Sequence, residues 1–155
     1  MLNEELFETI VRYTPLISVD LLVINSKSMV LLGWRNNSPA KDSWFVPGGR
    51  ILKDETVHEA FNRISYSELG IKLNLEDHEF VGVYEHLYPR ENFKDHPDLS
   101  THYIVLGFRI TGLDELGEMP LNQHQKYKWL TPDELLHDKD VHQNVKNYFN
   151  GTRLF

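Results

Sequence analysis

Residues 48–71 read GGRILKDETVHEAFNRISYSELGI, and they carry the strongest structural signal in the chain. The two glycines that follow a short apolar stretch let the backbone bend sharply and approach a ligand closely. Asp54 or Thr56 can cap the start of a helix, and Thr56 with Glu59 has the spacing of a capping box. Gly70 suits the left-handed turn that ends a helix. The apolar stripe of that helix is Val57, Ala60, Phe61 and Ile64. The segment therefore predicts a strand, a loop and a helix in succession.

Charged side chains within this segment have ordinary interpretations when each is taken alone. Glu59 and Arg63 are four positions apart, which is the spacing of an ion pair on the solvated face of a helix. Glu68 is expected at the surface, as most glutamates are. Only the joint spacing of these residues points to a shared chemical role.

The composition of the whole chain limits the class of protein. The 155 residues carry a net charge of −7, which argues against non-specific binding to nucleic acid or to an anionic membrane. The absence of cysteine excludes disulfides, thiolate metal sites and a cysteine nucleophile. No apolar run approaches the roughly 20 residues that span a bilayer, and the acidic start is unlike a signal peptide. We therefore expect a single domain over residues 1–155, located in the cytoplasm.

Apolar patterns along the rest of the chain predict a mixed α/β fold. Residues 17–24 form a dense apolar run, which is expected to pair with residues 29–32 as a hairpin. The other expected elements are strands at 79–88, 102–111 and 126–130, and helices at 3–13, from Thr131 onward and at 141–149. Strands interleaved with few helices favour a mixed sheet with helices on both faces.

Polar residues within the predicted strands are candidates for a functional site. Asp20 lies inside an apolar strand, where a carboxylate is seldom buried without a partner. His86 and His102 lie in apolar-aromatic strands and are expected to be structural or to line a pocket, not to bind a metal.

The spacing of residues 49–71 resembles the Nudix box, G-x5-E-x7-R-E-U-x-E-E-x-G-U, where U is a bulky aliphatic residue. The matching positions are Gly49, Glu55, Arg63, Glu68, Gly70 and Ile71. The departures are Ile64, Ser65 and Ser67, which stand where the box has Glu, an aliphatic residue and Glu. The resemblance implies a Nudix-type α/β/α sandwich with a mixed β-sheet, in which the strand–loop–helix element is catalytic.

These departures change the metal chemistry that the helix can support. Positions 64, 67 and 68 share one helix face, where three carboxylates would hold two or three divalent cations around a diphosphate. Glu68 remains alone there, which favours one Mg2+ completed by carbonyl, water and phosphate oxygens. The base that activates water is therefore expected elsewhere.

Within the Nudix superfamily, nearly the whole chain resembles the GDP-mannose mannosyl hydrolases. The resemblance is carried by residues 44–50 (WFVPGGR), 101–103 (THY), 105–109 (VLGFR), 123–124 (QH) and 129–131 (WLT). Those enzymes cut the sugar C1–O bond with inversion and release GDP and free mannose. The resemblance therefore implies hydrolysis of GDP-mannose, with GDP-glucose as an open alternative.

The same resemblance implies a set of site residues. One Mg2+ per subunit, with Mn2+ as an alternative ion, would be held by the Gly48 carbonyl, Glu68 and Gln123, and His124 would be the general base. The remaining matches are the catalytic and substrate-binding Arg35, Arg50 and Tyr103, the catalytic Asp20, and the nucleotide-contacting Phe7 with Leu2 nearby. The family is dimeric, which implies a homodimer with both subunits near each site.

Two other functions stay open at this point. An ordinary Nudix pyrophosphohydrolase would cleave a P–O bond of another nucleoside diphosphate derivative. A non-catalytic module would bind a nucleotide sugar without forming product. Guanine over adenine, and mannose over glucose, rest on the resemblance alone.

Overall fold

A computed structural model describes residues 2–37, 40–89, 96–114, 116, 119 and 124–155, with the backbone alone at 124 and 125. The elements, in chain order, are α1 (Glu4–Tyr13), β1 (Leu16–Val23), β2 (Val30–Arg35), β3 (Trp44–Phe45), β4 (Gly48–Arg50), α2 (Val57–Leu69), the 3-10 turn η1 (Leu75–Asp77), β5 (Glu79–Tyr88), β6 (Thr101–Ile110), β7 (His124–Leu130), α3 (Pro132–His137) and α4 (Gln143–Lys146). Within the described ranges, no helix is long and apolar enough to cross a membrane.

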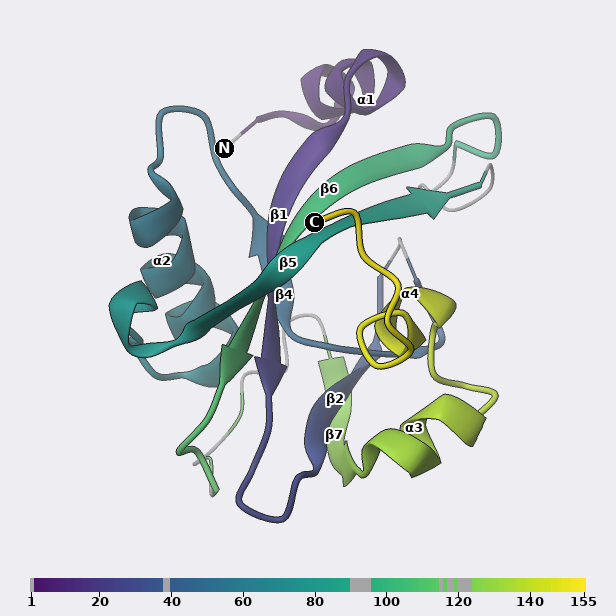
Figure 1. Cartoon of the computed structure of the whole chain (residues 1–155). Helices are drawn as coiled ribbons and strands as arrows, with labels where there is room; N and C mark the ends of the chain where they lie inside the picture. The colour runs from purple at the N-terminus through teal and green to yellow at the C-terminus, as the bar shows by residue number, and fades with distance from the viewer. Residues whose placement is uncertain (1, 38–39, 90–95, 115, 117–118, 120–123) are drawn as a thin grey trace.

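The strands of the described residues form two sheets (Figure 1). The larger sheet has the order β4-β1-β6-β5, and the smaller has the order β3-β2-β7. Strands β1 and β6 run parallel, while β4 and β5 are antiparallel to their neighbours. Helix α2 lies on one side of the larger sheet, and α3 and α4 lie on the other (Figure 1). The predicted mixed α/β architecture with helices on both faces is confirmed.

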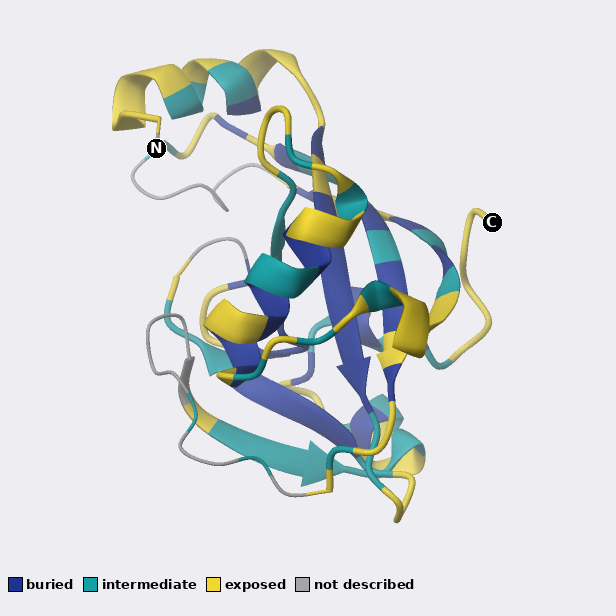
Figure 2. Cartoon of the chain, turned by 90° about the vertical axis from the view of Figure 1, so that its left-hand side faces the viewer, coloured by how far each residue is buried: buried dark blue, intermediate teal, exposed yellow. Residues whose placement is uncertain are grey.

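Helix α2 buries one face against the larger sheet, as its apolar stripe predicts. Ala60, Phe61 and Ile64 pack with Val19 and Leu21 of β1. Figure 2 shows buried residues on the side of α2 that faces the sheet and exposed ones on the opposite side. Thr56 closes the predicted capping box, and the helix ends at the left-handed Gly70. Of the two candidate caps, Asp54 and Thr56, the structure selects Thr56, and the predicted end at Gly70 is confirmed.

A second apolar cluster fills the space between the two sheets and the C-terminal helices. Leu22 of β1 and Leu32 of β2 pack with Tyr84, Leu135 and Val145. Because side chains alternate along a strand, β1 sends its odd-numbered residues toward α2 and its even-numbered residues toward this second cluster. Ser18 and Asp20 therefore lie on the side of the sheet away from the apolar face of α2.

The predicted hairpin of residues 17–24 and 29–32 is wrong. Strands β1 and β2 belong to different sheets and share only the single bridge between Ile24 and Val30. Both edges of β1 are already paired, with β4 on one side and β6 on the other. Strand β2 consequently turns away and pairs with β3 and β7.

The predicted terminal helix at 141–149 is longer than the helix observed. Helix α4 spans Gln143–Lys146 and continues as tighter turns, in which Tyr148 N–H donates to the Val145 carbonyl and Phe149 N–H to the Lys146 carbonyl. These i→i+3 bonds are typical of a chain that leaves an α-helix. The turn directs the Tyr148 ring into the protein, where it is buried.

Candidate active site

A cavity of about 260 Å³ lies on the side of the larger sheet that Ser18 and Asp20 face. Its lining combines charged groups with aromatic rings that come from both sheets and from α1. The lining residues are Phe7, Ser18, Asp20, Arg35, Ala40, Phe45, Val46, Gly48, Gly49, Arg50, His86, Tyr88 and Tyr103. Six residues that the sequence nominated, namely Phe7, Asp20, Arg35, Gly48, Arg50 and Tyr103, therefore meet around one cavity.

Asp20 is a buried carboxylate with a hydrogen-bond partner. Its side chain is 5% exposed, and the Tyr148 hydroxyl donates to its Oδ2 over 2.5 Å. Burial raises the pKa of Asp20 to about 7, and the Tyr148 bond and the Arg35 charge oppose that rise. The expectation that a carboxylate at this position needs a partner is confirmed. The partner itself lies 128 positions away, and nothing in the local sequence identifies it.

The two glycines allow close approach on both sides of β4. Gly48 stands opposite Asp20 in the sheet, and a Cβ on Gly48 would collide with the Asp20 carboxylate and the Val19 carbonyl. A Cβ on Gly49 would lie 3.2 Å from the Ile64 side chain of α2. The glycine pair therefore lets Asp20 and α2 come close to the same short strand.

Glu68 is buried, contrary to its expected place at the surface. It is 5% exposed, and burial raises its pKa to about 7. The Arg35 charge and a hydrogen bond from the Gly48 backbone N–H lower that pKa, while the Asp20 charge raises it. Glu68 is thus in electrostatic contact with Gly48, Arg35 and Asp20, which all line the cavity.

The departures from the Nudix box have structural roles on α2. Ile64 is 1% exposed and belongs to the core cluster beneath the helix. The buried Ser65 hydroxyl accepts from the Leu73 N–H at 3.0 Å and so holds the chain that follows the helix. Ser67 is exposed. Neither position 64 nor position 67 supplies an acidic group beside Glu68.

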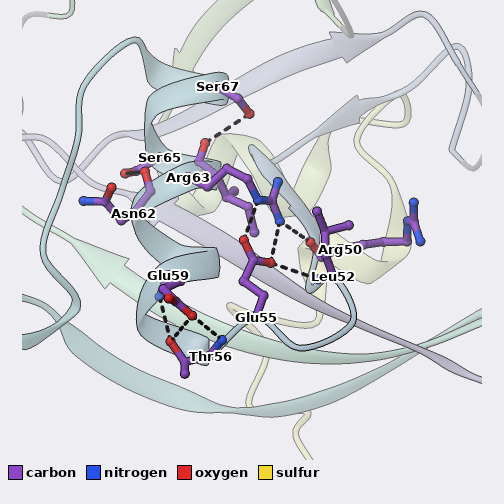
Figure 3. Close-up of polar contacts among 10 residues, drawn as sticks. Arg50, Leu52, Glu55, Thr56, Glu59, Asn62, Arg63, Ser65 and Ser67 are labelled. Atoms are coloured by element: carbon purple, nitrogen blue, oxygen red, sulfur yellow. Dashed lines mark hydrogen bonds and ion pairs between the residues drawn. The ribbon is translucent and has the colours of Figure 1, made fainter. Parts of the chain in front are cut away.

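The predicted pair of Glu59 and Arg63 is wrong, because Arg63 bonds to Glu55 instead (Figure 3). The Arg63 guanidinium donates to the two Glu55 carboxylate oxygens at 2.6 and 2.9 Å and to the Arg50 carbonyl at 2.7 Å. Glu59 accepts from the Thr56 N–H at 2.8 Å within the capping box. The Arg63 bonds fix the loop that joins β4 to α2.

Arg50 and α1 form one end of the cavity. The Arg50 guanidinium lies 4.4 Å from the centre of the Phe7 ring, a cation–π contact. Burial raises the pKa of the nearby Tyr103 hydroxyl, and the charges of Arg50 and Arg35 oppose that rise. Leu2 is 41% exposed and is not among the lining residues.

Of the proposed general base, His124, the structure describes the backbone alone, and it does not describe the third metal ligand, Gln123. The backbone of His124 pairs with Arg35 across β2 and β7, so residue 124 begins β7 beside a cavity-lining residue. Gln123 lies outside the described residues. Both assigned roles stay predictions.

The two histidines of the neighbouring strands differ in position. His86 lines the cavity, and burial together with the His142 charge lowers its pKa to about 4, so its ring is neutral near pH 7. His102 lies 3.3 Å from the Glu85 carboxylate at a more exposed position. His86 therefore confirms the expectation of a pocket-lining residue.

Residues 14–150 match the family model of the NUDIX domain, and the chain belongs to this family of Nudix hydrolases. Among curated proteins it is similar to the low-salt glycan biosynthesis protein Agl8 of Haloferax volcanii, with 38% identity over 145 residues that cover 94% of this chain and 86% of that protein.

Solved structures share the fold. One is the MutT protein from Methanosarcina mazei, with a TM-score of 0.71, 21% identity and coverage of 90% of this chain and 94% of that one. Another is the NUDIX domain of Shewanella oneidensis NrtR complexed with ADP ribose, with a TM-score of 0.62, 14% identity and coverage of 95% and 96%. At these identities the likeness shows the fold alone.

Nudix enzymes generally use divalent cations such as Mg2+, and the residues present fit one. Glu68 is a buried carboxylate, and burial raises its pKa to about 7, so that a cation beside it would stabilise its charged form. The adjacent Gly48 donates its backbone N–H to Glu68. Within the described part of the chain, no group of three or more His, Asp and Glu side chains forms a candidate metal cluster.

Proposed function

We propose that the protein is a Mg2+-dependent hydrolase of GDP-mannose, or of GDP-glucose, that releases GDP and free sugar. Water would attack the anomeric carbon, the C1–O bond would break, and the configuration at C1 would invert. The observation that carries this proposal is the acidic content of α2. Glu68 is the sole buried carboxylate of that helix, and Ile64, which stands where the Nudix box has Glu, packs in the core.

The charges around the cavity suit this reaction. Negative charge grows on the departing diphosphate as the glycosyl bond breaks. Arg35 and Arg50 line the cavity and would bind that diphosphate, because a guanidinium can bond two phosphate oxygens at once. A cation held by Gly48, Glu68 and Gln123 would neutralise part of the same charge. Asp20 would stabilise the positive charge that develops on the sugar.

His124 would take the proton from the attacking water, since a neutral imidazole is a suitable base near pH 7. The name of the relative Agl8 supports a substrate used in glycan biosynthesis, a class to which nucleotide sugars belong. We further propose that the chain acts as a cytoplasmic homodimer and forms one domain over residues 1–155.

Hydrolysis of GDP-mannose in 18O-labelled water tests the proposal directly. We expect the label in mannose, detected by mass spectrometry, and none in GDP. Label in a phosphate group, with mannose 1-phosphate as product, would instead establish P–O cleavage by an ordinary pyrophosphohydrolase. Tight binding of GDP-mannose without product in Mg2+ would establish a binding module.

Removal of the proposed base gives a second test. We expect His124→Gln to lower kcat by at least about a hundredfold with little change in KM, because the base acts in the transition state more than in binding. His102→Gln is the matched control, since that exposed histidine pairs with Glu85. Equal rates for the two variants would contradict the role of His124. Size-exclusion chromatography with light scattering tests the dimer.

A further inference from the structure

Tyr148 lies behind the cavity and contacts its carboxylate without lining it. The residue follows α4 near the C-terminus, is 8% exposed, and donates from its hydroxyl to Asp20 Oδ2 over 2.5 Å. The same hydroxyl oxygen lies 3.4 Å from His86 Nε2. Two residues that line the cavity, from β1 and β5, thus meet at one tyrosine hydroxyl.

We propose that Tyr148 is a positioning residue of the active site, whose hydroxyl fixes the Asp20 carboxylate in the orientation that the reaction requires. This inference rests on the proposed function. Tyr148 would act through Asp20, because it is absent from the residues that line the cavity.

Packing holds the Tyr148 ring in place. Its centre lies 4.4 Å from that of the Tyr84 ring in an edge-to-face arrangement, and 5.7 Å from the centre of the His86 ring. Gly107 of β6 leaves room for both tyrosines, since a Cβ there would lie 3.2 Å from Tyr84 and 3.5 Å from Tyr148. A ring packed on these sides presents its hydroxyl at a defined point.

The hydrogen bonds have a defined direction. A tyrosine hydroxyl has one proton, and Tyr148 uses it to donate a hydrogen bond to the Asp20 carboxylate. The hydroxyl oxygen can then accept from His86, provided that the proton of the neutral ring is on Nε2. The resulting order is His86 to Tyr148 to Asp20. Asp20 Oδ2 is thereby engaged, and Oδ1 stays beside Gly48, which lines the cavity.

A fixed carboxylate matters for cleavage at the anomeric carbon. Positive charge develops on the sugar ring as the C1–O bond breaks, and oriented negative charge stabilises that state most when it needs no reorganisation. Without the Tyr148 bond, the Asp20 carboxylate would be free to rotate toward the nearby Arg35 charge. The substrate would still bind, and the transition state would lose stabilisation.

Tyr148→Phe, assayed for free mannose release from GDP-mannose, tests this role. We expect kcat to fall about ten- to a hundredfold with KM within about twofold of the parent value, as for other residues that orient a reacting group. Tyr84→Phe is the matched control, because Tyr84 is equally buried and packs on the same ring but does not line the cavity. Similar kcat values for the two variants would overturn the proposal.

A double-mutant cycle separates positioning from general damage. In an Asp20→Asn background, Tyr148→Phe should have little further effect on kcat, since its partner carboxylate is already gone. An undiminished loss in that background would show that Tyr148 does not act through Asp20. Thermal unfolding of each variant checks that the fold is retained.

A proton NMR measurement makes the outcome independent of the proposed reaction. The hydrogen-bonded Tyr148 hydroxyl should give a downfield resonance that is present in the parent protein and in Tyr84→Phe, and absent in Tyr148→Phe and Asp20→Ala. Absence of the resonance in the parent protein would overturn the positioning contact. Sugar phosphate as the parent product would refute the proposed function instead, and the same pair of variants would then be compared on that reaction.

Discussion

The two ends of α2 hold carboxylates in opposite environments. Glu55, just before the helix, is bonded to Arg63, and those bonds lower its pKa. Glu68, in the last turn, is buried beside the cavity, and burial raises its pKa to about 7. The first carboxylate forms an ion pair with Arg63, and burial is the main influence on the second. Within one short motif, Glu55 therefore holds the loop before the helix, and Glu68 is the candidate for a role in the reaction.

The largest expected effect comes from the second carboxylate. Glu68→Gln should lower release of free sugar by at least about a hundredfold and abolish its dependence on Mg2+, because a metal that neutralises the leaving group contributes several kcal/mol. The matched control is Glu76→Gln, which removes an exposed carboxylate of η1 that pairs with His58 of α2. An unchanged Mg2+ dependence in Glu68→Gln would show that Glu68 does not hold the cation.

The ion pair of Glu55, the first carboxylate, with Arg63 should instead affect stability. Arg63→Met removes three hydrogen bonds, two to Glu55 and one to the Arg50 carbonyl, and should lower the free energy of unfolding by about 2 kcal/mol. Arg109→Met is the control, since Arg109 and Glu79 form an exposed pair 3.6 Å apart whose loss should cost less than about 0.5 kcal/mol. Urea unfolding measures both variants, and equal losses would contradict a structural role for Arg63.

The pH dependence of stability should have opposite signs at the two ends. Between its ordinary pKa near 4.5 and the folded value of about 7, Glu68 holds a proton in the folded protein that the unfolded chain has lost. Stability due to Glu68 is therefore present below pH 4.5 and is lost as the pH rises to about 7. For Glu55 the folded pKa is lowered, so its contribution is present at neutral pH and is lost on acidification.

Thermal unfolding in EDTA at pH 5 and pH 8 tests these signs. Relative to the parent protein, Glu68→Gln should gain about 1–2 kcal/mol on going from the lower pH to the higher, a relative rise of a few degrees in Tm. Glu55→Gln should lose stability at pH 8. Parallel pH profiles for the parent protein and Glu68→Gln would show that Glu68 is not buried in the metal-free protein.

The smallest expected effect comes from the helix cap. Thr56→Ala removes the acceptor for the Glu59 N–H and should cost about 1 kcal/mol of stability without changing the KM for GDP-mannose. Thr56→Ser keeps the hydroxyl and serves as the control. A large change in KM for Thr56→Ala would show that the two ends of α2 are coupled.

Local patterns in the sequence were sufficient for much of the fold. The capping box at Thr56 and the left-handed Gly70 define α2 because each depends on residues within one helical turn. The pairing of β1 and β2 was predicted incorrectly, since β4 and β6 compete for the same edges of β1. That competition involves strands far apart in the chain, so it is absent from any local pattern.

The same division applies to the candidate site. Residue type nominated Asp20, a carboxylate in an apolar strand, and the spacing of the Nudix box nominated Glu68. The family resemblance supplied Arg35 and Arg50. Tertiary structure alone determined that Glu68 is buried and that Tyr148 is the partner of Asp20. Burial and long-range hydrogen bonds arise when strands and helices pack together, and the pKa of each carboxylate follows from that packing and not from its neighbours in sequence.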